Sequence, residues 1–303
     1  MKTQSFIMRI AIHTWEPINN KFYRACLAEF IAMFFFVLMC CGCAMVTFHM
    51  ENPNLMQVAS SFGFGIMVIA QFVGPLSGAH INCAVSFALY IAGRCSLVRA
   101  VCYTLCQMLG SVFGALFLRA IFGTHWQGGA RAFGSNSWDD DVFTGGEVFL
   151  AEMFGTSLLV FTVLATIDMP VAGGGSLGVF PIAMSVFVAH LFLLPIDGCS
   201  INPTRSFGPS LVAAMSKIDG SYQDQQYMFW FGPLFGAALT AVIYEYGSLK
   251  PHKRDGAGDM DDAIYMANVR RKGAKKDTNG EFEAQVDEDE DNLRDVELAA
   301  SEA

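Results

Sequence analysis

Charged residues are scarce in this chain of 303 residues. Asp, Glu, Lys and Arg make up 16% of it, whereas about 25% is typical of a soluble domain. Hydrophobic residues make up 53%, and the mean hydropathy is +0.40. The scarcity is confined to residues 1–248, which hold 10 basic and 13 acidic residues, because residues 249–303 hold 9 and 15. A body so apolar and without a basic patch argues against a soluble enzyme and a nucleic-acid binder, and predicts a polytopic membrane protein.

The sequence also lacks a disulfide framework and a signal peptide. The nine cysteines lie in or beside apolar segments, not at the spaced loop positions of a secreted disulfide scaffold, so we interpret them as mostly buried thiols. Residues 1–21 lack the apolar core and the small-residue cleavage site of a signal peptide. We therefore expect the first apolar segment itself to direct the chain to the membrane.

Apolar runs long enough to cross a bilayer, about 20 residues each, occur six times. They cover residues 24–47, 55–75, 97–122, 146–167, 176–195 and 227–248. We interpret them as helices, because a helix satisfies its own backbone hydrogen bonds in lipid. Two shorter apolar pieces, 81–93 and 201–215, cannot cross the membrane and are typical of re-entrant half-helices. The predicted fold is an all-α membrane protein with six transmembrane helices and two re-entrant half-helices.

The basic residues predict the orientation. Lys and Arg are concentrated in residues 1–24, in 94–99 and in 250–276, whereas residues 123–145 hold one Arg beside three consecutive Asp. Because basic loops remain in the cytoplasm, both termini are predicted to be cytoplasmic. We expect a cytoplasmic segment 1–21, a membrane domain 22–248, and a disordered acidic cytoplasmic tail 249–303. The main role of this tail is expected to be solubilising.

The membrane domain repeats itself. The matching pairs are Glu29 with Glu152, Gly110 with Gly232, and Asn82 with Asn202, at offsets of 123, 122 and 120 residues. Each half, about 22–122 and 146–248, contains three predicted spans, so the second half must enter the membrane from the opposite face. Such an inverted repeat with interrupted segments indicates a site near the bilayer midplane.

The half-helices carry the chemistry of that site. Asn is a preferred N-cap and Pro a preferred first helical residue, so Asn202-Pro203 predicts the start of one half-helix and, by the repeat, Asn82-Cys83 the start of the other. In an inverted arrangement the two N-termini face each other, each with roughly half a positive charge. The two Asn amides can then donate hydrogen bonds to a passing polar molecule, while the helix ends repel cations.

Residues 77–85 and 198–207 resemble the two Asn-Pro-Ala boxes of the aquaporin (major intrinsic protein) family. The resemblance covers about 22–248 and includes the Ala-Glu-Phe opening at residues 28–30, Gln107 in the third span and Phe-Trp-Phe-Gly-Pro at 229–233. It implies a channel that assembles as a homotetramer with one pore per subunit, in the plasma membrane. The box residues are Asn82, Cys83, Ala84, Asn202, Pro203 and Thr204. Cys83 stands where the family usually has Pro, and Thr204 where it usually has Ala.

The resemblance also implies a selectivity filter of the water-selective type. By position it would consist of Phe62, His190, Cys199 and Arg205. His190 and Arg205 would narrow the pore, offer hydrogen-bond donors to water and exclude glycerol, and Arg205 would repel protons and cations. A mercurial should react with Cys199 and block conduction. Glu29, Glu152 and Gln107 would support the half-helices.

The predicted function is a passive water channel that excludes protons and ions, with water and the lipid bilayer as partners. Alternatives are a channel for hydrogen peroxide, glycerol, urea or ammonia, or a junctional membrane protein of low conductance, which the unusual first box favours. We expect no enzyme, cofactor or metal site. No nucleophile and base stand together, Cys40-Cys41-x-Cys43 has no His or carboxylate beside it, and no Lys-Ser/Thr follows the glycines at 173–175.

Overall fold

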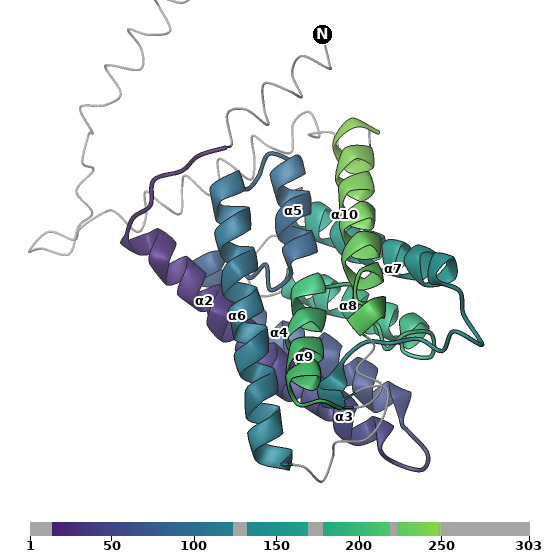
Figure 1. Ribbon diagram of the computed structural model, residues 1–303. Coiled ribbons are helices and arrows are strands. Elements are labelled where there is room, and N and C mark those ends of the chain that lie inside the picture. The colour runs from purple at the N-terminus through teal and green to yellow at the C-terminus, as the bar shows by residue number, and fades with distance from the viewer. Residues whose placement is uncertain (1–13, 124–131, 169–177, 219–222, 248, 250–303) are drawn as a thin grey trace, which may run out of the picture. The chain divides into compact units, whose positions relative to one another are not determined.

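The computed structural model describes residues 14–123, 132–168, 178–218, 223–247 and 249. The chain divides into two units, residues 1–250 and 251–303, and every described residue belongs to the first. Within the described ranges all regular structure is helical (Figure 1). The helices are α2 (Asn20–Phe36), η1 (Val37–Cys41), α3 (Gly42–Phe48), α4 (Leu55–Ser77), α5 (Cys83–Ile91), α6 (Leu97–Phe122), η2 (Ala132–Gly134), α7 (Gly145–Asp168), α8 (Val179–Leu193), α9 (Pro203–Met215), η3 (Gln223–Gln225) and α10 (Met228–Tyr246).

Five of these helices are long and apolar enough to cross a membrane: the continuous helix Asn20–Phe48, α4, α6, α7 and α10. The sixth predicted span, 176–195, contains the apolar helix α8 of 15 residues, and its first two residues lie outside the described part. The first span begins at Asn20, earlier than predicted, because the Asn19 side chain accepts hydrogen bonds from the backbone N–H of Lys21 and Phe22. The protein is therefore an integral, multi-pass membrane protein.

The two short helices begin where the sequence predicts. Helix α5 has 9 residues with Asn82 as N-cap, and α9 has 13 residues with Asn202 as N-cap and Pro203 in its first turn. In Figure 1, α5 lies in the upper half of the molecule and α9 in the lower half. Their Asn residues lie between them, so the two half-helices approach the middle of the molecule from opposite sides.

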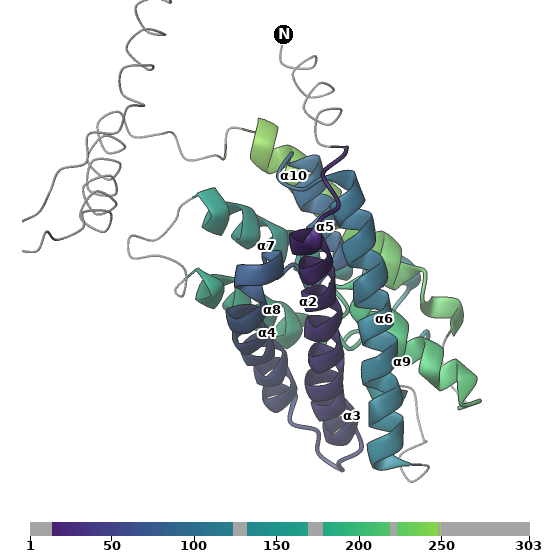
Figure 2. The same cartoon turned by 90° about the vertical axis from the view of Figure 1, so that its left-hand side faces the viewer.

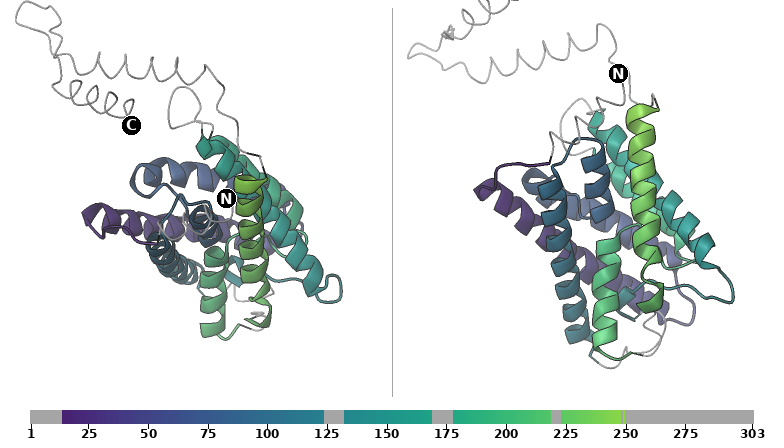
Figure 3. Two further views of the ribbon diagram at one scale, coloured as in Figure 1. Left: turned by 90° about the horizontal axis from the view of Figure 1, so that it is seen from above. Right: turned by 45° about the horizontal axis from the view of Figure 1, so that its top comes forward.

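Glycines let neighbouring helices approach closely at equivalent places in the two repeats. Helices α2 and α6 run side by side (Figure 2), and a Cβ atom on Gly110 would collide with the carbonyl oxygen of Phe30. At the equivalent crossing of α7 and α10, a Cβ atom on Gly232, the counterpart of Gly110, would collide with the Cβ atom of Glu152. Helix α9 lies between α6 and α10 (Figure 3). Small residues thus set the helix spacing that surrounds the half-helices.

The outward faces of the long helices are apolar. On α6 the exposed large side chains recur every four residues and form one stripe along the helix, consisting of Val101, Leu105, Leu109, Phe113, Phe117 and Ile121. A soluble monomer rarely leaves an apolar stripe of this size open to water. Lipid or another subunit is therefore expected to cover it. This pattern agrees with a helix bundle that lies in a bilayer.

Charged side chains fasten the ends of several helices. Arg94, which follows α5, donates hydrogen bonds to Asp168 at the end of α7 (2.9 Å) and to Glu245 near the end of α10 (2.6 Å). Glu16, before α2, accepts hydrogen bonds from Arg99 at 2.6 and 2.7 Å and from the Ser96 hydroxyl at 2.6 Å. Partial burial raises the pKa of Glu16, but the hydrogen bonds and the charge of Arg99 outweigh it, and the pKa is lowered overall.

Candidate functional site

A buried glutamate holds the turn that leads into the first half-helix. The carboxylate of Glu29 accepts hydrogen bonds from the Ser77 hydroxyl (2.6 Å), from the backbone N–H of His80 (2.9 Å) and Ile81 (2.7 Å), and from the Gln107 side chain (2.8 Å). Each of the two Glu29 carboxylate oxygens therefore accepts two hydrogen bonds, and the donors belong to this turn and to α6. In the second repeat Glu152 does the same for the turn before α9, accepting from the N–H groups of residues 200 and 201 at 2.6 Å.

These turns are strained at matching positions. Ile81 and Ile201 have φ values of 51° and 41°, in the left-handed region that a β-branched residue rarely adopts. Strain of this kind, about 1–3 kcal/mol per residue, persists only where the surroundings determine the conformation. The two glutamates supply that restraint, because each accepts the N–H of the strained isoleucine. The strain turns each carbonyl group of Ile81 and Ile201 toward the opposite repeat.

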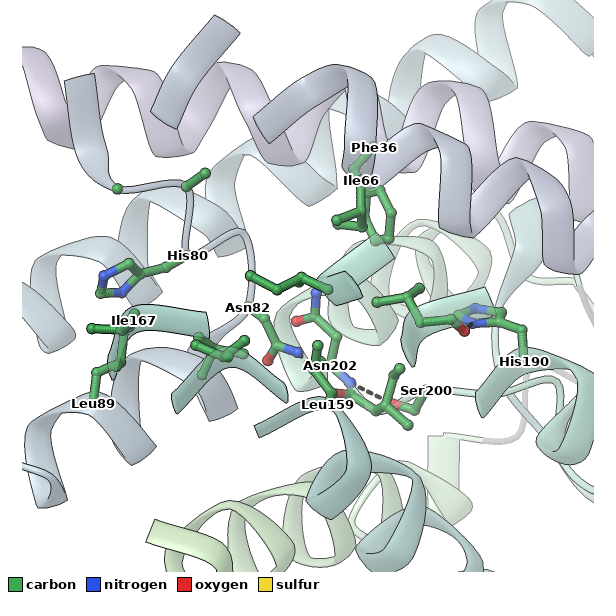
Figure 4. Close-up of a pocket in the computed structure, with 17 residues that line it drawn as sticks. Phe36, Ile66, His80, Asn82, Leu89, Leu159, Ile167, His190, Ser200 and Asn202 are labelled. Carbon is green, nitrogen blue, oxygen red and sulfur yellow. Dashed lines mark hydrogen bonds between the residues drawn. The ribbon is translucent and has the colours of Figure 1, made fainter. Parts of the chain in front are cut away.

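The two asparagines meet in the centre of the molecule. The side-chain amide of Asn82 donates to the carbonyl oxygen of Ile201, and that of Asn202 donates to the carbonyl oxygen of Ile81, both at 2.7 Å. Figure 4 shows the two side chains together, between His80 on one side and His190 on the other. Each amide nitrogen carries two hydrogens, so each retains one N–H after these bonds. The structure therefore brings the two half-helix N-termini together.

A cavity runs past the two asparagines (Figure 4). Its lining includes Phe36, Ile66, His80 and His190 as well as Asn82 and Asn202. The space open to the centre of a water molecule is about 110 Å³, whereas one water needs about 10–15 Å³ on this measure. The cavity is therefore large enough for several waters in sequence. Its walls are mostly apolar, with the two Asn amides at its middle.

Three of the four predicted filter residues lie in contact. The ring of Phe62 is stacked on that of His190, with centroids 4.1 Å apart, and the Arg205 guanidinium lies 5.0 Å from the centre of the Phe62 ring. Each of the three side chains is at most 1% exposed. His190 lines the cavity, whereas Phe62 and Arg205 do not. His190 is therefore the member of this group that the cavity reaches.

Cys199, the fourth predicted filter residue, is fully buried in the turn before α9. Its backbone N–H donates to Asp197 at 2.8 Å, and its φ of 57° is left-handed. The Cys199 side chain is not among those that line the cavity. The structure thus brings Phe62, His190 and Arg205 together, whereas the Cys199 side chain does not line the cavity.

The sequence did not identify the residues that hold Arg205. One guanidinium nitrogen donates to the carbonyl oxygen of Gly134 (2.8 Å) and to the side-chain oxygen of Asn136 (2.6 Å). Both belong to the connection between α6 and α7, which the sequence marked only as a loop. Within this group two buried nitrogens have no partner among the described residues, Nε2 of His190 and Nε of Arg205.

The two departures from the family boxes are buried at the same junction. Cys83 is the first residue of α5 and is 4% exposed, and Thr204 is fully buried in the first turn of α9. The Thr204 hydroxyl has one proton, which the shorter distance assigns to Asn202 Oδ1 (2.8 Å); its oxygen also lies 3.2 Å from Gln107 Oε1. Ala84 and Pro203, the remaining box residues, are also buried. All six box residues therefore lie in the interior.

The comparisons with known proteins agree with this architecture. The family described as "Major intrinsic protein" matches residues 16–244. Aquaporin PIP2-7 of Arabidopsis thaliana is 36% identical over 237 residues, which cover 75% of this chain and 81% of that protein. Aquaporin-2 of Homo sapiens is 35% identical over 239 residues, which cover 79% and 84%.

A solved structure has the same fold. The X-ray structure of the aquaglyceroporin from Plasmodium falciparum superposes with a TM-score of 0.67 and covers 74% of this chain and 96% of that one. Its sequence identity is 18%, so the likeness bears on the fold alone. It confirms the predicted fold class, an all-helical membrane bundle of the aquaporin type.

Proposed function

Because this chain belongs to the major intrinsic protein family of membrane channels, we propose that it is a passive water channel that excludes protons and ions. The family is one of channels and not of enzymes, which agrees with the expectation that the chain has no enzymatic activity. The choice of water among small neutral solutes is the part that needs support from the site.

The observation that carries this proposal is the pair of buried nitrogens at the Phe62–His190–Arg205 group. Nε2 of His190 and Nε of Arg205 have no hydrogen-bond partner in the part of the chain that the structure describes. A buried polar group left unpaired costs about 1–3 kcal/mol. A water molecule that passes His190 would satisfy its ring nitrogen, and the apolar ring of Phe62 offers no competing bond. The group is therefore suited to a small molecule that both donates and accepts.

The same group argues against glycerol. Phe62 and His190, whose ring centroids lie 4.1 Å apart, would form a narrow passage together with Arg205, and a carbon chain needs a wider passage than water does. Hydrogen peroxide is close to water in size and hydrogen-bonding capacity, so we propose it as a second permeant. Urea and ammonia are tested in the same assay.

Ion exclusion has two sources in this arrangement. The N-termini of α5 and α9 meet at Asn82 and Asn202, and each carries roughly half a positive charge. Arg205 adds a full positive charge, held by Gly134 and Asn136. Helix dipoles and an arginine at a constriction are an electrostatic barrier to protons and cations. We propose that both act on the same single file of water.

The remaining roles follow from the contacts. We propose that Glu29, Glu152 and Gln107 support the half-helices, and that the protein forms homotetramers, as is typical of the family, in the plasma membrane with both termini in the cytoplasm. The tail and residues 1–13 lie outside the described residues.

The test is water flux through the purified full chain in lipid vesicles. Under an outward osmotic gradient, vesicles with the protein should shrink several times faster than empty vesicles, with glycerol entry and proton leak equal to those of empty vesicles. Glycerol entry as fast as water would favour the solute channel. Shrinkage no faster than that of empty vesicles would favour the junctional protein of low conductance.

A further inference from the structure

The two unusual box residues lie at the junction where the half-helices meet. Cys83 begins the half-helix of the first repeat, and Thr204 lies in the first turn of the second. Both residues are buried, at 4% and 0% exposure. The two departures therefore belong to one part of the structure, although 121 positions separate them in the chain.

Thr204 changes the way in which its asparagine is held. In the first box, Asn82 Oδ1 accepts a short bond of 2.8 Å from the backbone N–H of Ala84. In the second box, the backbone bond to Asn202 Oδ1 comes from Arg205 and is long, at 3.3 Å. The short bond there, also 2.8 Å, comes from the Thr204 hydroxyl. An alanine, the usual residue at this position, has no group that could make it.

The hydroxyl also connects the asparagine to the opposite half of the molecule. Thr204 Oγ1 lies 3.2 Å from Gln107 Oε1, and Gln107 Nε2 donates to Glu29 at 2.8 Å. A line of side chains therefore leads from Glu29, which fixes the Ile81 turn, to Asn202, whose amide donates to the Ile81 carbonyl. Because the hydroxyl carries one proton, the shorter distance assigns it to Asn202 Oδ1. That bond fixes the direction of the Asn202 amide more tightly than the long backbone bond could.

We propose that Thr204 is a positioning residue for permeation, whose hydroxyl orients the Asn202 amide and replaces, at this junction, the restraint that a proline at position 83 would supply. Proline sets φ at the first helical position. Cys83 leaves φ free there, next to the Ile81 carbonyl that accepts the Asn202 amide. This inference rests on the proposed water channel, since water flux is its main readout.

The first experiment compares Thr204→Val with Thr204→Ser in vesicles. Valine keeps the shape of threonine and removes the hydroxyl, whereas serine keeps the hydroxyl. We expect Thr204→Val to lower water permeability per folded protein about fivefold, the equivalent of about 1 kcal/mol, and Thr204→Ser to keep it. Thr162→Val is the matched control, because the Thr162 hydroxyl only bonds back to its own helix, to the Leu158 carbonyl. Permeability of Thr204→Val equal to that of the control would overturn the proposal.

The activation energy of water flux separates positioning from misfolding. A loss of folded channels lowers the flux but leaves its temperature dependence unchanged, whereas a misdirected Asn202 amide raises the activation energy of each channel. We expect a higher activation energy for Thr204→Val than for wild type. Reduced flux with an unchanged activation energy would assign Thr204 a purely structural role and refute the inference.

The second experiment tests the coupling of the two residues. In the Cys83→Pro background the backbone restraint is restored, so Thr204→Val should lower permeability less than twofold there, compared with about fivefold in the wild-type background. Equal effects in both backgrounds would show that the two residues act independently. If wild type itself conducts no water, the proposed function fails first, and the same variants are then compared with hydrogen peroxide as permeant.

Discussion

The carboxylate of Glu29 offers a sharp test of how the first half-helix is held. It accepts four hydrogen bonds, from the Ser77 hydroxyl, the N–H groups of His80 and Ile81, and the Gln107 amide. Glu29→Gln keeps the shape but puts an NH₂ group where one carboxylate oxygen accepts two donors. At least two bonds are then lost. At about 1.5–3 kcal/mol for each bond to a charged group, the free energy of unfolding should fall by about 3–6 kcal/mol.

This loss is comparable with the lower part of the 5–15 kcal/mol range that is typical of folded proteins. It corresponds to a decrease of roughly 6–24 °C in Tm for a chain of this size class. The assay is thermal unfolding of the purified protein in detergent, followed by size-exclusion chromatography of the surviving fraction. The matched control is Glu51→Gln, because Glu51 is exposed between α3 and α4 and should leave Tm unchanged.

Water permeability provides the second readout for Glu29→Gln. Any protein that folds should conduct less water, because the Ile81 carbonyl that receives the Asn202 amide would no longer be fixed. Glu152→Gln should act in the same direction through the second turn. If Glu29→Gln and Glu51→Gln have the same Tm and the same flux, the carboxylate does not hold the strained turn and the reasoning fails.

Three further predictions follow from the site. Replacing His190 with Gly and Arg205 with Val together should admit glycerol, measured as glycerol-driven reswelling of vesicles; no glycerol entry would mean that these side chains do not form the constriction. A mercurial should slow water flux in wild type but not in Cys199→Ser, and slowly in wild type because the thiol is fully buried; equal block of both proteins would exclude Cys199 as the target. The lowered pKa of Glu16 adds stability at neutral pH that is lost as the pH falls below about 4, so Tm should decline less steeply with acid in Glu16→Gln; parallel Tm curves would contradict this.

Local signals in the sequence were sufficient to predict which segments are helical and where the half-helices begin. Apolar runs of bilayer length predicted the spans, and Asn82 and Asn202-Pro203 predicted where the half-helices begin, because caps and first-turn residues act on their immediate neighbours. The interruption of the first span by the π-helix Val37–Cys41 was not predicted. An extra residue in a helical turn leaves the apolar pattern of a fully apolar segment unchanged.

The contacts of the site were less predictable than its residues. Phe62, His190 and Arg205 were named from the resemblance, and their roles stay proposals although the structure places them in contact. Asn136, which holds the Arg205 guanidinium, comes from a connecting segment 69 positions away. The contact between Thr204 and Gln107 spans 97 positions. Such pairs depend on how helices pack, and no spacing or periodicity along the chain encodes them.

The reciprocal amide bonds have a consequence for biosynthesis. Asn82 has its acceptor, the Ile201 carbonyl, only when 119 more residues have been made, which takes roughly 6–24 seconds at 5–20 residues per second. During that interval the Asn82 side-chain amide in the nascent first half lacks this hydrogen-bond acceptor. The first half-helix can therefore complete its hydrogen bonding at the junction only after the second repeat has been made.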